Sequence, residues 1–193
     1  ISIASMALGA FAAIGINVTS TVANTNNNIS GNSVSDITST GSTQVRGISV
    51  SGATGGLTVQ GNNVQGIIST NTGTFGAYGI DLSGGNNIAV RNNFVSNVNH
   101  NMTGGSAFST TFGLFGIRIG AGTGIQVHNN SVNLYGLMPG TATTSHLSAA
   151  FAVVATTSTG CDVRNNIFAN NITGGTTSVA AVSVFLPTGG TSA

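Results

Sequence analysis

The stretch Asn86–Val98, which reads NNIAVRNNFVSNV, contains the pattern that decides the fold. Two short runs of alternating apolar and polar residues flank a polar corner at residues 91–93. Side chains of a β-strand point alternately to its two faces, so Ile88 and Val90 share one face and Ala89 lies on the other. The stretch therefore predicts two short strands joined by a sharp turn.

The same corner recurs along the chain at a nearly regular interval. The equivalent corners end in Asn32, Asn62, Asn93, Asn130 and Asn166, with steps of 30, 31, 37 and 36 residues. A second motif, Gly-Ile-x-Val, precedes the corners at Gly47–Val50, Gly79–Leu82 and Gly116–Ile119, with further copies expected at Gly15–Val18, Ala152–Ala155 and Ala181–Val184. Two motifs with one period predict a repeat protein whose units bury their apolar faces by stacking.

We expect one domain over residues 1–193, an all-β, right-handed parallel β-helix of about five coils of 30–37 residues. The corner asparagines are expected to adopt the left-handed αL conformation, which Asn tolerates. Stacked about 4.8 Å apart, their amides would bond to one another as a ladder. The alternative is that Asn is simply common in polar loops.

Both ends of the chain indicate a segment of a longer protein. Residues 1–18 are apolar but lack a basic n-region, which favours the tail of an earlier coil over a signal peptide or membrane span. Ala12–Ile14 offers a competing register there. Neither end carries a recognisable polar cap. The expected partners are therefore the rest of the same chain or end-to-end copies, and an isolated monomer is not expected.

The composition excludes several classes of function. Charged residues make up 4% of the chain and the net charge is +1, so we expect no nucleic-acid partner. An uncharged polar surface is typical of extracellular solenoids, which predicts an extracellular or cell-surface location without membrane insertion. The single Cys161 occupies the slot of Ile125 in the previous repeat, which favours a buried hydrophobe over a reactive thiol.

The acidic residues are too few and too dispersed for glycan cleavage. Such enzymes need clustered carboxylates, as an acid/base pair or as Ca²⁺ ligands. Asp36, Asp81 and Asp162 fall on different strands of different repeats. We therefore assign no catalytic residue, no metal site and no cofactor, although enzymatic activity stays open because missing residues could complete a site.

Two groups of charged residues are expected to make contacts. Asp81 and Arg118 occupy equivalent positions one repeat apart, which predicts an exposed ion pair worth about 0–1 kcal/mol. Arg91, His128 and Arg164 follow one another at the corner and form a short basic stripe. The stripe could meet an acidic glycan, and the alternative is that these are solvated corner residues.

The loops at residues 99–116 and 136–152 are the longest. They carry the apolar or aromatic residues Met102, Phe108, Phe112, Phe115, Leu137, Met138, His146 and Leu147. Insertions in solenoids gather on one face, often the binding face. We favour the alternative, that these residues fold back as local cover.

The segments Val90–Val95 and Val163–Phe168 resemble the right-handed parallel β-helix repeats of the pectate-lyase-like superfamily. The segments Asn129–Tyr135 and Asn165–Ile172 look most like very large secreted bacterial surface proteins. That resemblance implies secretion and a role as adhesin, stalk or filament. The leading hypothesis is thus a non-catalytic structural or adhesive segment, and the other is a carbohydrate-active enzyme or glycan-binding module.

Overall fold

The computed structural model describes residues 2–8, 12–19, 27–52, 55–71, 75–100, 110, 113–138, 146–174 and 179–187. These residues form three parallel sheets and contain no helix. Sheet A consists of β1 (Ser2–Leu8), β4 (Ser33–Ser39), β7 (Asn63–Ser69), β10 (Phe94–His100), β13 (Ser131–Met138) and β16 (Ile167–Gly174). Sheet B consists of β2 (Ile14–Thr19), β5 (Val45–Ser51), β8 (Ala77–Leu82), β11 (Leu114–Ile119), β14 (His146–Val153) and β17 (Val179–Phe185). Sheet C consists of β3 (Asn28–Ser30), β6 (Thr58–Gln60), β9 (Ala89–Arg91), β12 (Gln126–His128) and β15 (Asp162–Arg164).

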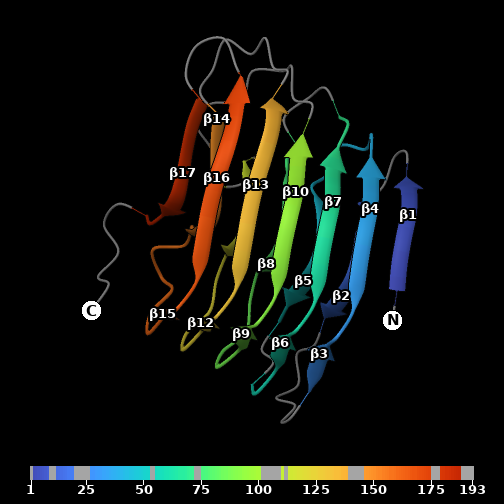
Figure 1. Cartoon of the computed structure of the whole chain (residues 1–193). Helices are drawn as coiled ribbons and strands as arrows, with labels where there is room; N and C mark the ends of the chain where they lie inside the picture. The colour runs from blue at the N-terminus through green and yellow to red at the C-terminus, as the bar shows by residue number, and fades with distance from the viewer. Residues whose placement is uncertain are drawn as a thin grey trace.

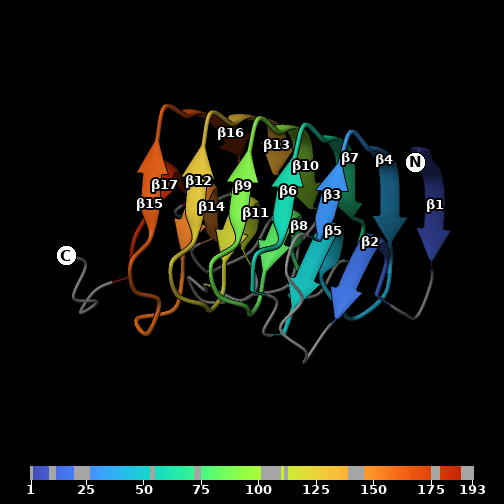
Figure 2. The same ribbon diagram turned by 90° about the horizontal axis from the view of Figure 1, so that it is seen from below.

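The chain winds through the three sheets as a parallel β-helix. It rises along sheet A at the front, crosses to sheet B behind, descends, and returns through sheet C at the bottom, while each coil lies further to the left (Figure 1). Figure 2, seen from below, shows sheet C between the other two sheets. This path is right-handed, as predicted. The helix makes about four turns rather than the five coils predicted, because the five corners from Asn32 to Asn166 enclose four turns.

The inward side chains form continuous apolar columns, which confirms the predicted alternation. Fully buried members are Val34, Val64, Val95 and Val132 in sheet A, Ile48, Ile80 and Ile117 in sheet B, and Val59, Val90 and Val127 in sheet C. Cys161 is only half-buried because it belongs to the last described turn. Burial nevertheless raises the pKa of its thiol, which disfavours the reactive thiolate.

The register of sheet B confirms the first predicted copy of the Gly-Ile-x-Val motif and corrects the last two. Ile16 pairs with Ile48, so Gly15–Val18 is the first copy and the register at Ala12–Ile14 is wrong. Ile117 pairs with Phe151, and Phe151 pairs with Val184. The late copies therefore lie two residues away from the predictions, at 150–153 and 183–186. Aromatic Phe151 occupies the isoleucine position, which disguised the motif.

Glycine in this motif is required by the close approach of sheets A and B. A Cβ atom on Gly79 would lie 2.4 Å from Cγ1 of Val95 and 2.6 Å from the carbonyl oxygen of Gly116. Gly15, Gly47 and Gly116 meet equivalent obstacles in their own coils. The glycine column of sheet B thus faces the valine column of sheet A with no room for a side chain.

The corner asparagines form the predicted ladder. In each step, the backbone N–H and the Nδ2 group of one asparagine donate to Oδ1 of the next, at 2.9–3.0 Å. The rungs are Asn32, Asn62, Asn93, Asn130 and Asn166, all buried except the half-buried Asn166. In the four later rungs Nδ2 also donates to a backbone carbonyl, as from Asn93 to Val59 (2.9 Å). An inner rung such as Asn93 therefore satisfies its whole amide inside the protein.

The left-handed conformation lies one residue before the predicted position. Gly31, Gly61, Asn92, Asn129 and Asn165 have φ between 55° and 63°, whereas no ladder asparagine has a positive φ. The expectation that the ladder residues adopt αL is therefore wrong. The turn is made by the preceding residue, and this leaves the next side chain pointing inward, where it can bond to its neighbours.

We expect Gly79→Ala to lower the free energy of unfolding by about 2–3 kcal/mol, because the added methyl overlaps Val95 and a backbone carbonyl. Gly55→Ala is the matched control, since a Cβ there would have no heavy atom within 4 Å. It should change the free energy by no more than about 0.5 kcal/mol. Denaturant unfolding measures both, and equal effects would contradict the close approach of the sheets.

We expect Asn93→Leu to cost about 3 kcal/mol, because it leaves the donors of Asn62 without their acceptor and removes the Nδ2 donor to Asn130. Asn92→Gly is the control, since glycine readily adopts the φ of 55° at that position. Comparing the two adjacent substitutions distinguishes the contribution of the ladder to stability from that of the turn. A thermal midpoint unchanged by Asn93→Leu would show that the ladder does not stabilise the fold.

Candidate functional site

The three acidic residues are separated by the fold, as predicted. Asp36 lies on β4 of sheet A, Asp81 on β8 of sheet B and Asp162 on β15 of sheet C. No group of three or more His, Cys, Asp or Glu side chains in the described residues could hold a metal ion. The described acids are thus not placed to act as a pair on one substrate.

Asp81 is held by two arginines on the outer face of sheet B. Arg118 Nη1 donates to Asp81 Oδ1 at 2.8 Å, which confirms the predicted pair. Arg46 Nε lies 3.0 Å from Asp81 Oδ2, close enough for an ion pair although its N–H is not aimed at that oxygen. The carboxylate is fully buried, so the expectation of an exposed pair is wrong. Removing a partner from a buried carboxylate leaves an uncompensated charge inside the protein, which is strongly destabilising.

Sequence reasoning missed Arg46 because strict alternation places residues 46 and 49 on opposite faces. Gly47 and Ile48 both point inward, since a Cβ on Gly47 would strike Val64 and Ile48 is fully buried in the core. The alternation therefore slips by one residue, and Arg46 shares the outer face with Ser49 and its paired residue Asp81. The repeated glycine before an isoleucine is the signal for this slip.

Tyr78 lies beneath the two arginines. The guanidinium carbons of Arg46 and Arg118 lie 5.6 Å and 5.0 Å from its ring centroid, and the Phe115 ring lies 5.4 Å away. Tyr78 is 1% exposed. Burial raises the pKa of its hydroxyl above the ordinary value; Arg118 and Arg46 act in the opposite direction, while Asp81 adds to the rise. The cluster is a packed structural unit in which two guanidinium groups face one carboxylate, so one positive charge is not compensated within it.

Two of the apolar residues assigned to the long loops at 99–116 and 136–152 belong to this cluster. Phe115 and Leu147 belong to β11 and β14 and are buried with Tyr78 in a second apolar cluster, which agrees with the interpretation as cover. Leu137, in contrast, is 63% exposed on β13. Met138 and His146 are strand residues, and Met102, Phe108 and Phe112 lie outside the described residues.

The basic stripe lies in one row of sheet C, where Arg91 pairs with His128 and His128 with Arg164. Arg91 Nε donates to Gln60 at 3.0 Å. Arg164 Nη2 lies 2.6 Å and His128 Nε2 lies 3.2 Å from Asp162 Oδ2. Desolvation acts to raise the pKa of Asp162, but the contacts from Arg164 and His128 outweigh it and hold the pKa below its usual range. Asp162 thus neutralises part of the stripe, which sequence reasoning did not foresee.

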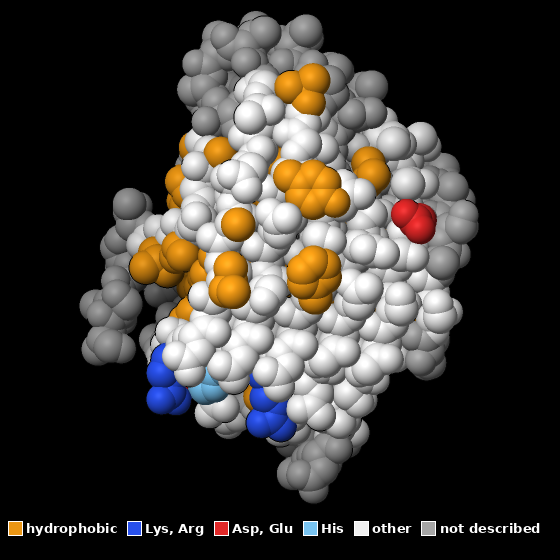
Figure 3. All heavy atoms as spheres, in the orientation of Figure 1, with side chains coloured by type: hydrophobic (Ala, Val, Ile, Leu, Met, Phe, Trp, Pro, Cys, Tyr) orange, Lys and Arg blue, Asp and Glu red, His pale blue; other side chains and the backbone are white. Residues whose placement is uncertain are grey.

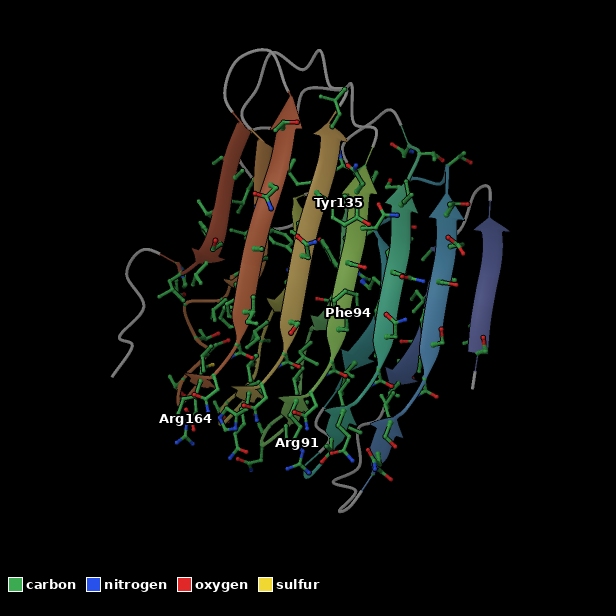
Figure 4. The ribbon with its side chains drawn as sticks, viewed as in Figure 1. Arg91, Phe94, Tyr135 and Arg164 are labelled. Atoms are coloured by element: carbon green, nitrogen blue, oxygen red, sulfur yellow. The ribbon has the colours of Figure 1, made fainter. Side chains whose placement is uncertain are left out.

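Two exposed aromatic side chains on sheet A were not predicted from the sequence. Phe94 and Tyr135 are each 45% exposed and point outward from β10 and β13 (Figure 4). Figure 3 shows the hydrophobic side chains of this face as separate patches among uncharged atoms. The signal was available in the alternation, because Val95 and Leu134 are inward and the residues beside them must face out.

An apolar hollow of about 240 Å³ lies at the last described turn, between β14, β15 and β17. Its lining includes Phe151, Cys161, Val163, Val184 and Leu186. Val163, Val184 and Leu186 are 38%, 46% and 56% exposed, although their equivalents in inner coils are buried. Among the described residues, the apolar columns are therefore partly exposed at this face.

Comparison with protein-family models, curated proteins and solved structures finds no match to this chain. The parallel β-solenoid is shown by the structure itself, and the finer resemblance to one superfamily is not. The described residues contain no helix long and apolar enough to cross a membrane.

We expect Tyr78 to remain protonated while the protein is folded, even as the pH rises beyond the ordinary tyrosine pKa of 10.0. Its folded pKa exceeds its unfolded pKa, so its contribution to stability is complete below pH 10 and is lost as the pH rises further. Ultraviolet titration of tyrosinate, followed with circular dichroism, measures this. Tyr78→Phe should abolish the phase that accompanies unfolding, and complete ionisation of the wild-type tyrosines before unfolding would contradict the burial.

Proposed function

We propose that this chain is a non-catalytic structural or adhesive segment of a secreted bacterial surface or extracellular filament protein. The observation that carries the proposal is the separation of the acids, each on a different sheet. Two of them are also engaged, Asp81 by Arg46 and Arg118 and Asp162 by Arg164. A glycan-cleaving site needs carboxylates that converge on one bond.

The repeated contacts between successive coils support a scaffold role. Each coil is tied to the next by backbone bonds in three sheets and by the asparagine ladder. Stability in such a stack is a sum of contacts between neighbouring coils, so the structure extends by repetition without a new core. These properties suit a rod that carries binding surfaces along its sides.

The surface chemistry and the resemblance support the extracellular assignment. Asn, Ser, Thr and Gly supply the polar positions, and four arginines and three aspartates are the charged residues of the whole chain. The segments Val90–Val95 and Val163–Phe168 resemble pectate-lyase-like β-helices, whose bacterial surface representatives are adhesins and filaments. Membership in that group is part of the proposal.

The proposed partner along the helix axis is a further coil. The hollow lined by Phe151, Val163 and Leu186 has the apolar character of the inner columns. A coil stacked there, from the same chain or from a second copy, would remove this apolar surface from water.

We expect no cleavage of neutral or acidic polysaccharides, with or without Ca²⁺, because the described acids do not converge. Reducing-end and unsaturated-product assays on purified protein measure this. Asp162→Asn is the informative variant, since its side chain is partly exposed and the substitution leaves the core intact. Turnover in the wild type that Asp162→Asn or Asp81→Asn abolishes would overturn the proposed function in favour of a carbohydrate-active enzyme.

A further inference from the structure

The outer face of sheet A carries two exposed aromatic rings, Phe94 and Tyr135, that are not part of the core. Phe94 sits in a row with Asn63 on one side and Ser131 on the other. Tyr135 pairs with Asn171 on the next strand. Both rings keep nearly half of their surface in water (Figure 4). Neither contributes to the inward columns, so burial in the core does not account for them.

The two rings are placed for an extended ligand. Ser131, the partner of Phe94, lies four residues before Tyr135 on β13. At about 3.3 Å per residue, the rings are roughly 13 Å apart along the strand direction. One sugar ring is too small to contact both, whereas an oligomer lying along the strands can reach each.

The surroundings of the rings are uncharged and combine polar side chains with two exposed apolar ones, Leu137 and Ile167. The side-chain amides of Asn63, Asn133 and Asn171 are exposed and make no hydrogen bond with the described residues. Figure 3 shows charged side chains only toward the edges of this face. Free amides offer both donors and acceptors, which suits a ligand that carries hydroxyl groups and no net charge.

We propose that this face binds a neutral polysaccharide, with Phe94 and Tyr135 stacking against sugar rings and the amides bonding to hydroxyls. The C–H groups of a pyranose carry a slight positive charge that the negative face of an aromatic ring attracts. The inference rests on the proposed adhesive function and names its ligand class. It differs from the basic stripe at Arg91 and Arg164, which would select acidic glycans.

A protein partner fits this face less well. The buried centre of a protein–protein interface is continuous and apolar. Here the hydrophobic side chains form separate patches (Figure 3), and the exposed amides of Asn63, Asn133 and Asn171 lie beside the two rings. Alternating apolar and hydrogen-bonding groups match a chain of sugars, in which the two kinds of surface also alternate.

The experiment measures binding of the full chain to two sets of polysaccharides. Cellulose, chitin and a soluble neutral β-glucan form the neutral set, and pectate and alginate form the acidic set. Pull-down serves the insoluble polymers and affinity electrophoresis the soluble ones. The test variant is Phe94→Ala with Tyr135→Ala. Tyr135→Phe keeps the ring, Leu186→Ala removes an exposed apolar side chain elsewhere, and Arg91→Ala with Arg164→Ala removes the stripe.

We expect at least one neutral polymer to bind, and the aromatic double variant to bind it at least about tenfold more weakly. Tyr135→Phe and Leu186→Ala should retain the affinity, with thermal midpoints close to the wild type. The inference is overturned by no binding to the neutral set, by binding that the double variant retains, or by binding confined to acidic polymers. None of these outcomes bears on the non-catalytic proposal. That proposal is tested separately, by product formation in the cleavage assay.

Discussion

The stacking of equivalent residues at the spacing of adjacent strands is the constraint on which the rest of the structure depends. Parallel strands lie about 4.8 Å apart, so every side chain has a near copy above and below it. An inward asparagine is costly to bury alone, yet in a column each amide meets the partner it needs. The same repetition makes the valine and isoleucine columns dry and continuous. Whether a given residue stabilises this fold therefore depends on the equivalent residues stacked above and below it.

Sequence reasoning predicted the architecture because period-two alternation and a fixed repeat are properties of the chain itself. The ladder and the inward columns were found in this way. The wrong predictions concern the register of the last coils and the position of the left-handed residue. Phe151 replaced isoleucine in its column and hid the register of the last coils. The residue before each ladder asparagine made the turn, and the glycines at this position in the first two corners, Gly31 and Gly61, were the available signal.

The candidate sites were less predictable than the fold, for a related reason. The burial of Asp81 depends on Arg46, and the two meet because Gly47 adds an inward position that breaks the alternation. Arg164 follows Asp162 by two residues on one strand, so that contact could have been predicted from the alternation, whereas the contact with His128 needed the register of β12 and β15. The exposed rings of Phe94 and Tyr135 follow from alternation alone, but they carry no charge and belong to no catalytic motif, so residue type did not mark them as a site.

The asparagine ladder also gives the solenoid an electrical direction. Each rung donates its N–H groups to the rung that follows it and accepts from the rung that precedes it. The amide dipoles consequently point the same way along the axis, and aligned dipoles strengthen one another. A rung added beyond Asn166 must present an oxygen to it, and a rung turned the other way would set donor against donor. Growth of the stack is thus permitted in a single orientation, and a column of neutral side chains distinguishes the two ends of the rod.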